Sequence, residues 1–220
     1  MGIMKPAVLI KKGAEASIYV GEWHDRRVVL KKRLPKKYRP PKLDAQIRSY
    51  RTIHEPQLMH EAKKAGVSTP TIFLVNVKDA TIIMEFIAGK QVKRLLNKVS
   101  MSKRKQLSIQ IGQLIGRLHK YGVIHGDLTT SNMILTPDER LFFVDFGLGE
   151  RTMETESRGV DMHLMKRALE SAHFQIAEKS FESVVTGYSE VLGEEKTQDV
   201  LDKIIEIERR GRYVAERRKE

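Results

Sequence analysis

The pattern of apolar residues changes part-way along this 220-residue chain, and this change constrains the fold more than any other feature. Before residue 89, short runs rich in β-branched side chains at Ala7–Ile10, Ser17–Trp23 and Arg27–Arg33 predict strands. After Gly89, apolar residues recur every three or four positions, which is the spacing of one helix face. We therefore predict an α+β chain with a strand-rich lobe followed by a helical lobe, and a ligand site in the cleft between them.

One helix is expected to interrupt the strands of the first lobe. Residues Leu43 to Ala65 fit a helix that ends at Gly66, with Pro56 expected to kink or split it. Thr71–Val75 and Ala80–Phe86 then predict a hairpin.

The second lobe begins with a strongly amphipathic helix, predicted to be capped by Ser102 and to end at Gly122. Two short strands follow at Met133–Leu135 and Leu141–Val144, and then three helices. We place the first lobe at residues 1–84, a hinge at 85–89, the second lobe at 90–208 and a basic tail at 209–220.

Composition limits the kind of protein. Forty Lys and Arg against twenty-eight Asp and Glu give a net charge of +12, which indicates a polyanionic partner or simply aids solubility. The absence of cysteine excludes disulfides, a thiolate nucleophile and Cys-ligated metals. No apolar run approaches the roughly 18 residues of a membrane span, and Met1–Pro6 lacks the apolar stretch of a secretory signal. We expect a cytoplasmic protein that does not enter a membrane.

The most informative motif is His125–Asn132, His-Gly-Asp-Leu-Thr-Thr-Ser-Asn, followed by Asp145-Phe146-Gly147. Phosphoryl transfer from ATP needs oxygen ligands for Mg²⁺ and a carboxylate that orients or deprotonates the attacking group. Asp127 suits the catalytic base, and Asn132 and Asp145 suit the metal ligands. At this spacing the sequence resembles the protein-kinase superfamily, which implies a reduced bilobal kinase-like fold.

The strand-rich lobe should then supply a lysine for the α- and β-phosphates. Lys31, at the end of the run Val28–Lys31, is our candidate, and Lys32 should point to the opposite face of the strand. Glu55 on the following helix is the expected partner of Lys31, with Glu61 as the alternative. The plainer alternative for either glutamate is a solvated helix face.

The expected phosphate loop is degenerate. Compared with the kinase pattern G-x-G-x-x-G-x-V, the segment 13–20 keeps only Gly13 and Val20, while Glu15 and Ile18 replace the other two glycines. We predict nucleotide contacts from Gly13, Glu15, Ser17 and Val20, although an ordinary hairpin turn fits the same residues.

The segment Ile83–Ile87 resembles the interlobe hinge of kinases. The backbone groups of Glu85 and Ile87 are expected to pair with adenine, and Met84 to line the back of the pocket. A plain strand explains these residues almost as well.

Several departures from signalling kinases are informative. Gly126 replaces the Arg that grips a phosphorylated activation loop, and Thr129 replaces a Lys of many Ser/Thr kinases. Only fifteen residues separate Asp145 from Asp161, without an Ala-Pro-Glu anchor, which leaves little platform for a peptide substrate. Asp161 is predicted to support the catalytic loop from a buried helix; a helix N-terminal Asp is the plainer reading.

These features together resemble one family, the small atypical kinase subunit of the KEOPS complex. The resemblance covers nearly the whole chain and includes Gly13–Ala16, Met84–Gly89, His125–Asn132 and Arg167–His173. It implies ATP and Mg²⁺ as cofactors and a role in forming threonylcarbamoyl-adenosine in tRNA. It also implies a partner subunit with an actin-like fold, which performs the transfer, and the other small KEOPS subunits. Relatives act as ATPases when docked on that partner and as weak Ser/Thr kinases when free.

Two basic segments gain meaning from this resemblance. Residues 31–42 hold seven Lys and Arg and no acid, and the tail 209–220 is rich in Arg. We expect these segments to contact the tRNA backbone or an acidic face of a partner. The simpler interpretation is that they form a solvated, charged surface. Deleting 209–220 should weaken tRNA binding in a salt-dependent way and leave ATP binding intact.

Two other functions stay open. Small-molecule phosphotransferases share His-Gly-Asp-Leu-x-x-x-Asn but need extra helices to enclose the acceptor. A catalytically silent kinase-like scaffold would fit the poor phosphate loop, although Lys31, Asp127, Asn132 and Asp145 argue against it. The sequence leaves open whether the acceptor is water, a partner's hydroxyl or this chain itself.

Overall fold

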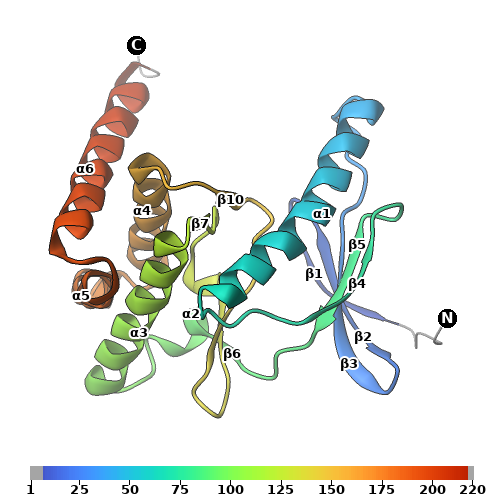
Figure 1. The fold of residues 1–220 in the computed structure, drawn as a ribbon, viewed down its shortest axis with the longest axis horizontal. Helices are drawn as coiled ribbons and strands as arrows, with labels where there is room; N and C mark the ends of the chain where they lie inside the picture. Colours follow the sequence, from blue (N-terminus) through green and yellow to red (C-terminus); the bar gives the residue numbers. More distant parts are fainter. Residues whose placement is uncertain (1–6, 218–220) are drawn as a thin grey trace.

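The computed structural model describes residues 7–217, with the side chains of residues 7–210. A β-sheet with one long helix forms the N-terminal lobe, and a helical bundle forms the C-terminal lobe (Figure 1). This is the predicted α+β arrangement.

The N-terminal lobe is built on a five-stranded antiparallel sheet with the order β1-β2-β3-β5-β4. A β-bulge interrupts the pairing of β1 with β2 between Leu9 and Lys11. His24 and Asp25 take positive φ values in the tight turn between β2 and β3, as two-residue hairpin turns require. The strands are β1 (Val8–Lys12), β2 (Ser17–Trp23), β3 (Arg26–Lys32), β4 (Ile72–Asn76) and β5 (Thr81–Glu85).

The helix of this lobe, α1 (Pro41–Lys64), runs unbroken through Pro56, so the predicted split is wrong. Proline removes one backbone donor, but the turns on both sides bury Thr52, Glu55, Leu58 and Met59, which holds the helix together. Gly66 follows the helix with a φ of +77°, as its predicted stop requires.

In the C-terminal lobe, α5 lies against α3 and also contacts α4 and α6, and α4 packs on α6 (Figure 1). Ser100, rather than the predicted Ser102, caps α3, because its side chain accepts a hydrogen bond from the Lys103 backbone N–H. The helices are α2 (Val92–Leu95), α3 (Met101–Lys120), α4 (Thr155–Ala172), α5 (Ala177–Leu192) and α6 (Glu194–Arg217), with short 3-10 turns at Thr130–Asn132 and Phe174–Ile176.

Short strands line the boundary between the lobes. β6 (Lys90–Gln91), β8 (Met133–Leu135) and β9 (Leu141–Phe143) form one small sheet, and β7 (Val123–Ile124) pairs with β10 (Glu150–Arg151). The loop before η1 (Thr130–Asn132) and the segment after β9 therefore lie side by side, which brings the two predicted catalytic motifs together.

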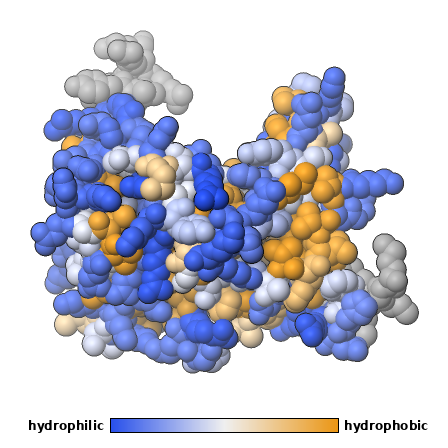
Figure 2. Space-filling view, in the orientation of Figure 1, coloured by the Kyte–Doolittle hydropathy of each residue, from blue (hydrophilic) through white to orange (hydrophobic). Residues whose placement is uncertain are grey.

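One apolar core continues through both lobes. Leu58 and Met59 of α1, Ile82 of β5, Leu118 of α3 and Phe146 are all buried in it. Figure 2 shows apolar side chains gathered on the strand-rich lobe and a largely hydrophilic helical lobe. Within residues 7–217, no helix is long and apolar enough to cross a membrane.

Candidate active site

The centre of the site is the Lys31 side chain at the end of β3. Its Nζ atom lies 2.7 Å from Glu55 Oε1 on α1 and 2.5 Å from Asp145 Oδ1. Strand alternation turns Lys31 inward and leaves Lys32 exposed, as predicted. Burial alone would lower the pKa of Lys31, but the carboxylates of Glu55 and Asp145 outweigh it and raise that pKa. The lysine is therefore a fixed ammonium that joins the two lobes.

Glu55 holds a second cation. Its Oε2 atom accepts a bond from the Arg33 guanidinium, which also lies 3.4 Å from Thr52 Oγ1. Arg33 and Glu55 are almost fully buried. Our reading of the basic run placed Arg33 among residues facing a partner, whereas it belongs to the interior. The signal that could have found it is its spacing of two residues from Lys31, since residues i and i+2 of an extended chain share a face.

Asp127 is positioned by Asn132. The Asn132 Nδ2 atom donates to both Asp127 Oδ2 at 2.8 Å and the Asp127 carbonyl at 2.9 Å. The amide carbonyl of Asn132 has no donor among the described residues, so it can accept a cation. The side chains of Asp127 and Asn132 thus form one tight unit at the start of η1.

Asp145 follows β9 in an unusual backbone conformation. Its φ of +69° lies in the left-handed region, which is uncommon for a non-glycine residue outside turns and is enriched at functional sites. The backbone N–H of the preceding residue, Val144, donates to the Asn132 carbonyl at 2.9 Å. Burial would raise the pKa of Asp145, but the Lys31 ammonium lowers it below its ordinary value. Asp145 is therefore an ionised carboxylate beside Asn132.

His125 supports the catalytic loop as a neutral ring. Its Nε2 atom donates to the Val144 carbonyl at 3.2 Å, and its Nδ1 atom accepts the Asp127 N–H at 3.3 Å. Burial lowers the pKa of His125, only partly opposed by Asp161 and Asp145, which is consistent with this tautomer. The ring also contacts the buried Phe146.

Asp161 on α4 supports the same loop from beneath, as predicted. Its carboxylate accepts the backbone N–H groups of His125 at 2.6 Å and Gly126 at 2.8 Å. His119 of α3 joins it at 3.3 Å and in turn contacts the Tyr188 hydroxyl at 2.8 Å. A buried polar chain therefore runs from α5 to the catalytic loop.

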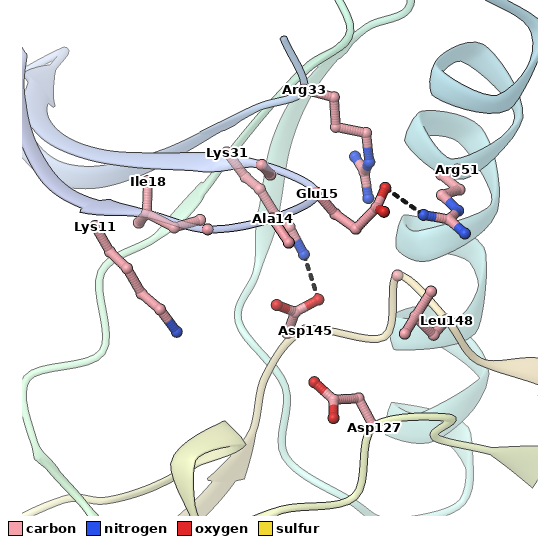
Figure 3. Close-up of a pocket in the computed structure, with 13 residues that line it drawn as sticks. Lys11, Ala14, Glu15, Ile18, Lys31, Arg33, Arg51, Asp127, Asp145 and Leu148 are labelled. Carbon is pink, nitrogen blue, oxygen red and sulfur yellow. Dashed lines mark hydrogen bonds and ion pairs between the residues drawn. The ribbon is translucent and has the colours of Figure 1, made fainter. Parts of the chain in front are cut away.

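A cavity of about 280 Å³ lies over these residues (Figure 3). Its lining contains Lys31, Asp127 and Asp145, together with Gly13 and Glu15 of the phosphate loop. The Gly13 N–H donates to the Ala16 carbonyl at 2.9 Å, and a Cβ on Gly13 would meet that oxygen at 3.0 Å, so the loop turns tightly here.

Glu15 does not project freely into this cavity. Its carboxylate lies 2.5 Å from Arg51 Nη1 on α1 and 3.2 Å from Arg39 Nη2, and Figure 3 shows it turned toward Arg51. The carboxylate that replaces a loop glycine therefore binds the loop to α1. The sequence placed Arg39 in the basic run expected to face a partner and gave Arg51 no role, because both pairings with Glu15 join residues far apart in the chain.

An adjoining cavity of about 210 Å³ is mainly apolar. Met84, Glu85 and Ile87 of the predicted hinge line it, together with Ile18 and Val144. Ser17 and Val20 line neither cavity, whereas Ile18, which our alignment with the kinase pattern did not select, lines both. An apolar space lined on one side by the polar backbone of a strand suits a purine base.

The residues present fit a magnesium ion bound with phosphates. No group of three or more His, Cys, Asp or Glu within the described part of the chain could hold a metal alone. The Asp145 carboxylate and the Asn132 amide oxygen supply two hard ligands, and Mg²⁺ commonly takes its remaining ligands from substrate phosphates and water.

Comparison with known proteins agrees with this geometry. Residues 8–179 match the protein kinase domain family. The chain is 46% identical over 211 residues to the KEOPS complex subunit Bud32 of Pyrococcus abyssi, and the match covers 93% of this chain and 96% of that protein. The chain belongs to the Bud32 family of atypical kinases. The resemblance inferred from the sequence motifs is thereby confirmed.

Longer relatives contain a similar segment. A probable bifunctional tRNA threonylcarbamoyladenosine biosynthesis protein of Methanothermobacter thermautotrophicus is 41% identical, but this chain spans only 38% of its length. Among solved structures, the Rio2 kinase–ADP/Mg²⁺–phosphoaspartate complex from Chaetomium thermophilum is similar with a TM-score of 0.62, at 17% identity and over 90% of this chain and 69% of that one. This likeness confirms the kinase-like fold.

Proposed function

We propose that this Bud32-family chain is a cytoplasmic, Mg²⁺- and ATP-dependent atypical kinase that works as an ATPase within a KEOPS complex. There it would support formation of threonylcarbamoyl-adenosine in tRNA. The observation that carries the proposal is the joined constellation of Lys31, Glu55 and Asp145 over the Asp127–Asn132 unit. Membership of the family supports the place in a KEOPS complex, and the geometry of the site supports the use of ATP.

Each side chain has a role that its position supports. Lys31 would contact the α- and β-phosphates, and Glu55 would keep its ammonium in place. Asn132 and Asp145 would hold Mg²⁺, which neutralises charge on the phosphates. Asp127, oriented by the Asn132 amide, would accept a hydrogen bond and then a proton from the attacking hydroxyl or water.

The short segment after Asp145 favours a small acceptor. Helix α4 begins at Thr155, ten residues after Asp145, and only β10 lies between them. A peptide groove of the usual kind needs a longer segment there. Water, or a group that a partner protein inserts, needs no such groove.

The named relatives support the choice of partners. One is a KEOPS complex subunit, and others are bifunctional proteins of tRNA threonylcarbamoyladenosine biosynthesis in which a segment like this chain is one part. We therefore propose an actin-like-fold threonylcarbamoyl-transferase subunit as the docking partner, with tRNA and the other small KEOPS subunits in the same assembly.

The test is ATP hydrolysis by the chain alone, with the transferase subunit, and with that subunit plus tRNA. We expect partner-stimulated phosphate release that Asp127→Asn and Asp145→Asn each abolish. Asp138→Asn, an exposed aspartate on the β8–β9 turn, is the matched control and should leave the rate unchanged. Label transferred to protein without partner stimulation would support a protein kinase instead. No turnover in any mixture would refute the proposal and leave a scaffold.

A further inference from the structure

Lys11 is a second lysine at the site, outside the residues to which the kinase pattern gives a role. It lies on β1 and lines both the phosphate cavity and the apolar cavity, a position shared with Lys31, Ile18 and Asp145. Figure 3 shows its side chain extending from β1 toward the open space of the site. Lys11 therefore stands where the two cavities meet.

The β-bulge explains how Lys11 reaches this position. Successive side chains of a regular strand point to opposite faces. Here, both Ile10 and Lys11 line the apolar cavity, and the pairing of β1 with β2 slips between Leu9 and Lys11. Such bulges redirect single side chains and occur often beside active sites.

The Lys11 ammonium has no acidic partner in the part of the chain whose side chains are described. Among residues 7–210, whose side chains are described, no ion pair or side-chain hydrogen bond engages it. The nearby loop carboxylate, Glu15, is held by Arg39 and Arg51, and Asp145 is held by Lys31. A free cation at the junction of a base cavity and a phosphate cavity is suited to the first phosphates of a nucleotide.

We propose that Lys11 binds the α- and β-phosphates of the nucleotide and compensates for the two glycines that the loop lacks. In a glycine-rich loop, backbone N–H groups approach the phosphates closely. Here Glu15 ties the loop to α1, and the Lys11 ammonium supplies the positive charge instead. The inference rests on the proposed use of ATP, and concerns binding rather than turnover.

Lys12 offers a matched control, because it is the next residue of β1, is exposed and lines neither cavity. Affinities for ATP, ADP and adenosine are measured with Mg²⁺ by calorimetry for the wild type, Lys11→Gln and Lys12→Gln. We expect Lys11→Gln to weaken ATP and ADP roughly tenfold or more, the loss typical of one charge-assisted hydrogen bond. Adenosine affinity should not change, and the salt dependence of ADP binding should become weaker.

The outcomes separate this inference from the proposed function. Equal nucleotide affinities for the two variants would overturn it, as would an equal loss of adenosine, which would indicate packing of the lysine stem on the base. A wild type that binds no nucleotide would overturn it as well. If nucleotide binding depends on Lys11 but ATP is not hydrolysed, the proposed ATPase function is refuted and the role of Lys11 stands. If ATP is hydrolysed but binding does not depend on Lys11, the role of Lys11 is refuted and the ATPase function stands.

Discussion

Replacing Glu55 by Gln should strongly destabilise the N-terminal lobe. The carboxylate lies between Lys31 and Arg33, with 1% of its side chain exposed, and a neutral amide cannot balance two buried cations. Breaking a buried ion pair by removing one partner costs about 3–5 kcal/mol. Asp145 still contacts Lys31 in the variant, so the unpaired charge is mainly that of Arg33. We therefore expect a loss near the lower end, about 3–4 kcal/mol.

Urea unfolding followed by circular dichroism measures this free energy directly, and a thermal scan should show a fall in Tm of about 6–16 °C for a chain of this size. Glu61→Gln on the same helix is the matched control. Its carboxylate pairs with Lys64 and Arg151 near the surface, so its loss should be much smaller.

A second variant tests the cause. If the unpaired charge of Arg33 causes the loss of stability, adding Arg33→Met to Glu55→Gln should restore part of it, because the buried cation is then absent. A loss below about 1 kcal/mol for Glu55→Gln with an unchanged denaturant m-value, or no recovery in the double variant, would refute the reasoning.

Three further predictions follow from the site. Asp161→Asn should reduce ATP turnover more than ATP affinity, because it weakens the acceptor of the His125 and Gly126 backbone N–H groups. Turnover and binding measured in parallel test this, and equal losses in both would contradict it. Gly126→Ala should prevent stable folding or abolish turnover, since φ is +78° and the new Cβ would lie 2.1 Å from the Leu148 carbonyl; a soluble variant with normal turnover would show that the loop adapts. The free energy of unfolding should fall as the pH drops from 7 toward 5. Burial lowers the pKa of His125, His163 and His173, so the unfolded chain binds protons at these residues before the folded chain does. The midpoint of urea unfolding should therefore be lower at pH 5.5 than at pH 7.5, and a constant midpoint would argue against this.

Local patterns were sufficient to predict most of the fold. Alternation in β3 separated the inward Lys31 from the exposed Lys32, and Gly66 and Gly122 both follow their helices with positive φ. Asp161 was found because a fixed motif order placed a carboxylate on the helix after the catalytic loop. The strand and glycine signals lie within a few residues of the features they determine, whereas Asp161 follows from motif order, because it bonds residues 35 and 36 positions away.

Features that depend on distant pairing were missed. Arg33 is buried against Glu55, 22 residues away, and Arg51 pairs with Glu15, 36 residues away. A run of basic residues looks the same in the sequence whether its members face solvent or the interior. The predicted role of the tail 209–220 lies almost wholly outside the residues whose side chains are described, so it stays a prediction.

The ion pairs of α1 also affect how a nucleotide enters and leaves. Arg51 fastens the loop above the site to this helix, and Glu55 fastens the helix to Lys31, which contacts Asp145 in the other lobe. The phosphate loop, α1 and the Asp145 segment are thus connected by successive ion pairs. The loop therefore cannot move away from the site without also displacing α1. We therefore expect release of a bound nucleotide to need a joint movement of the loop and α1, because the Arg51–Glu15 and Glu55–Lys31 ion pairs connect them.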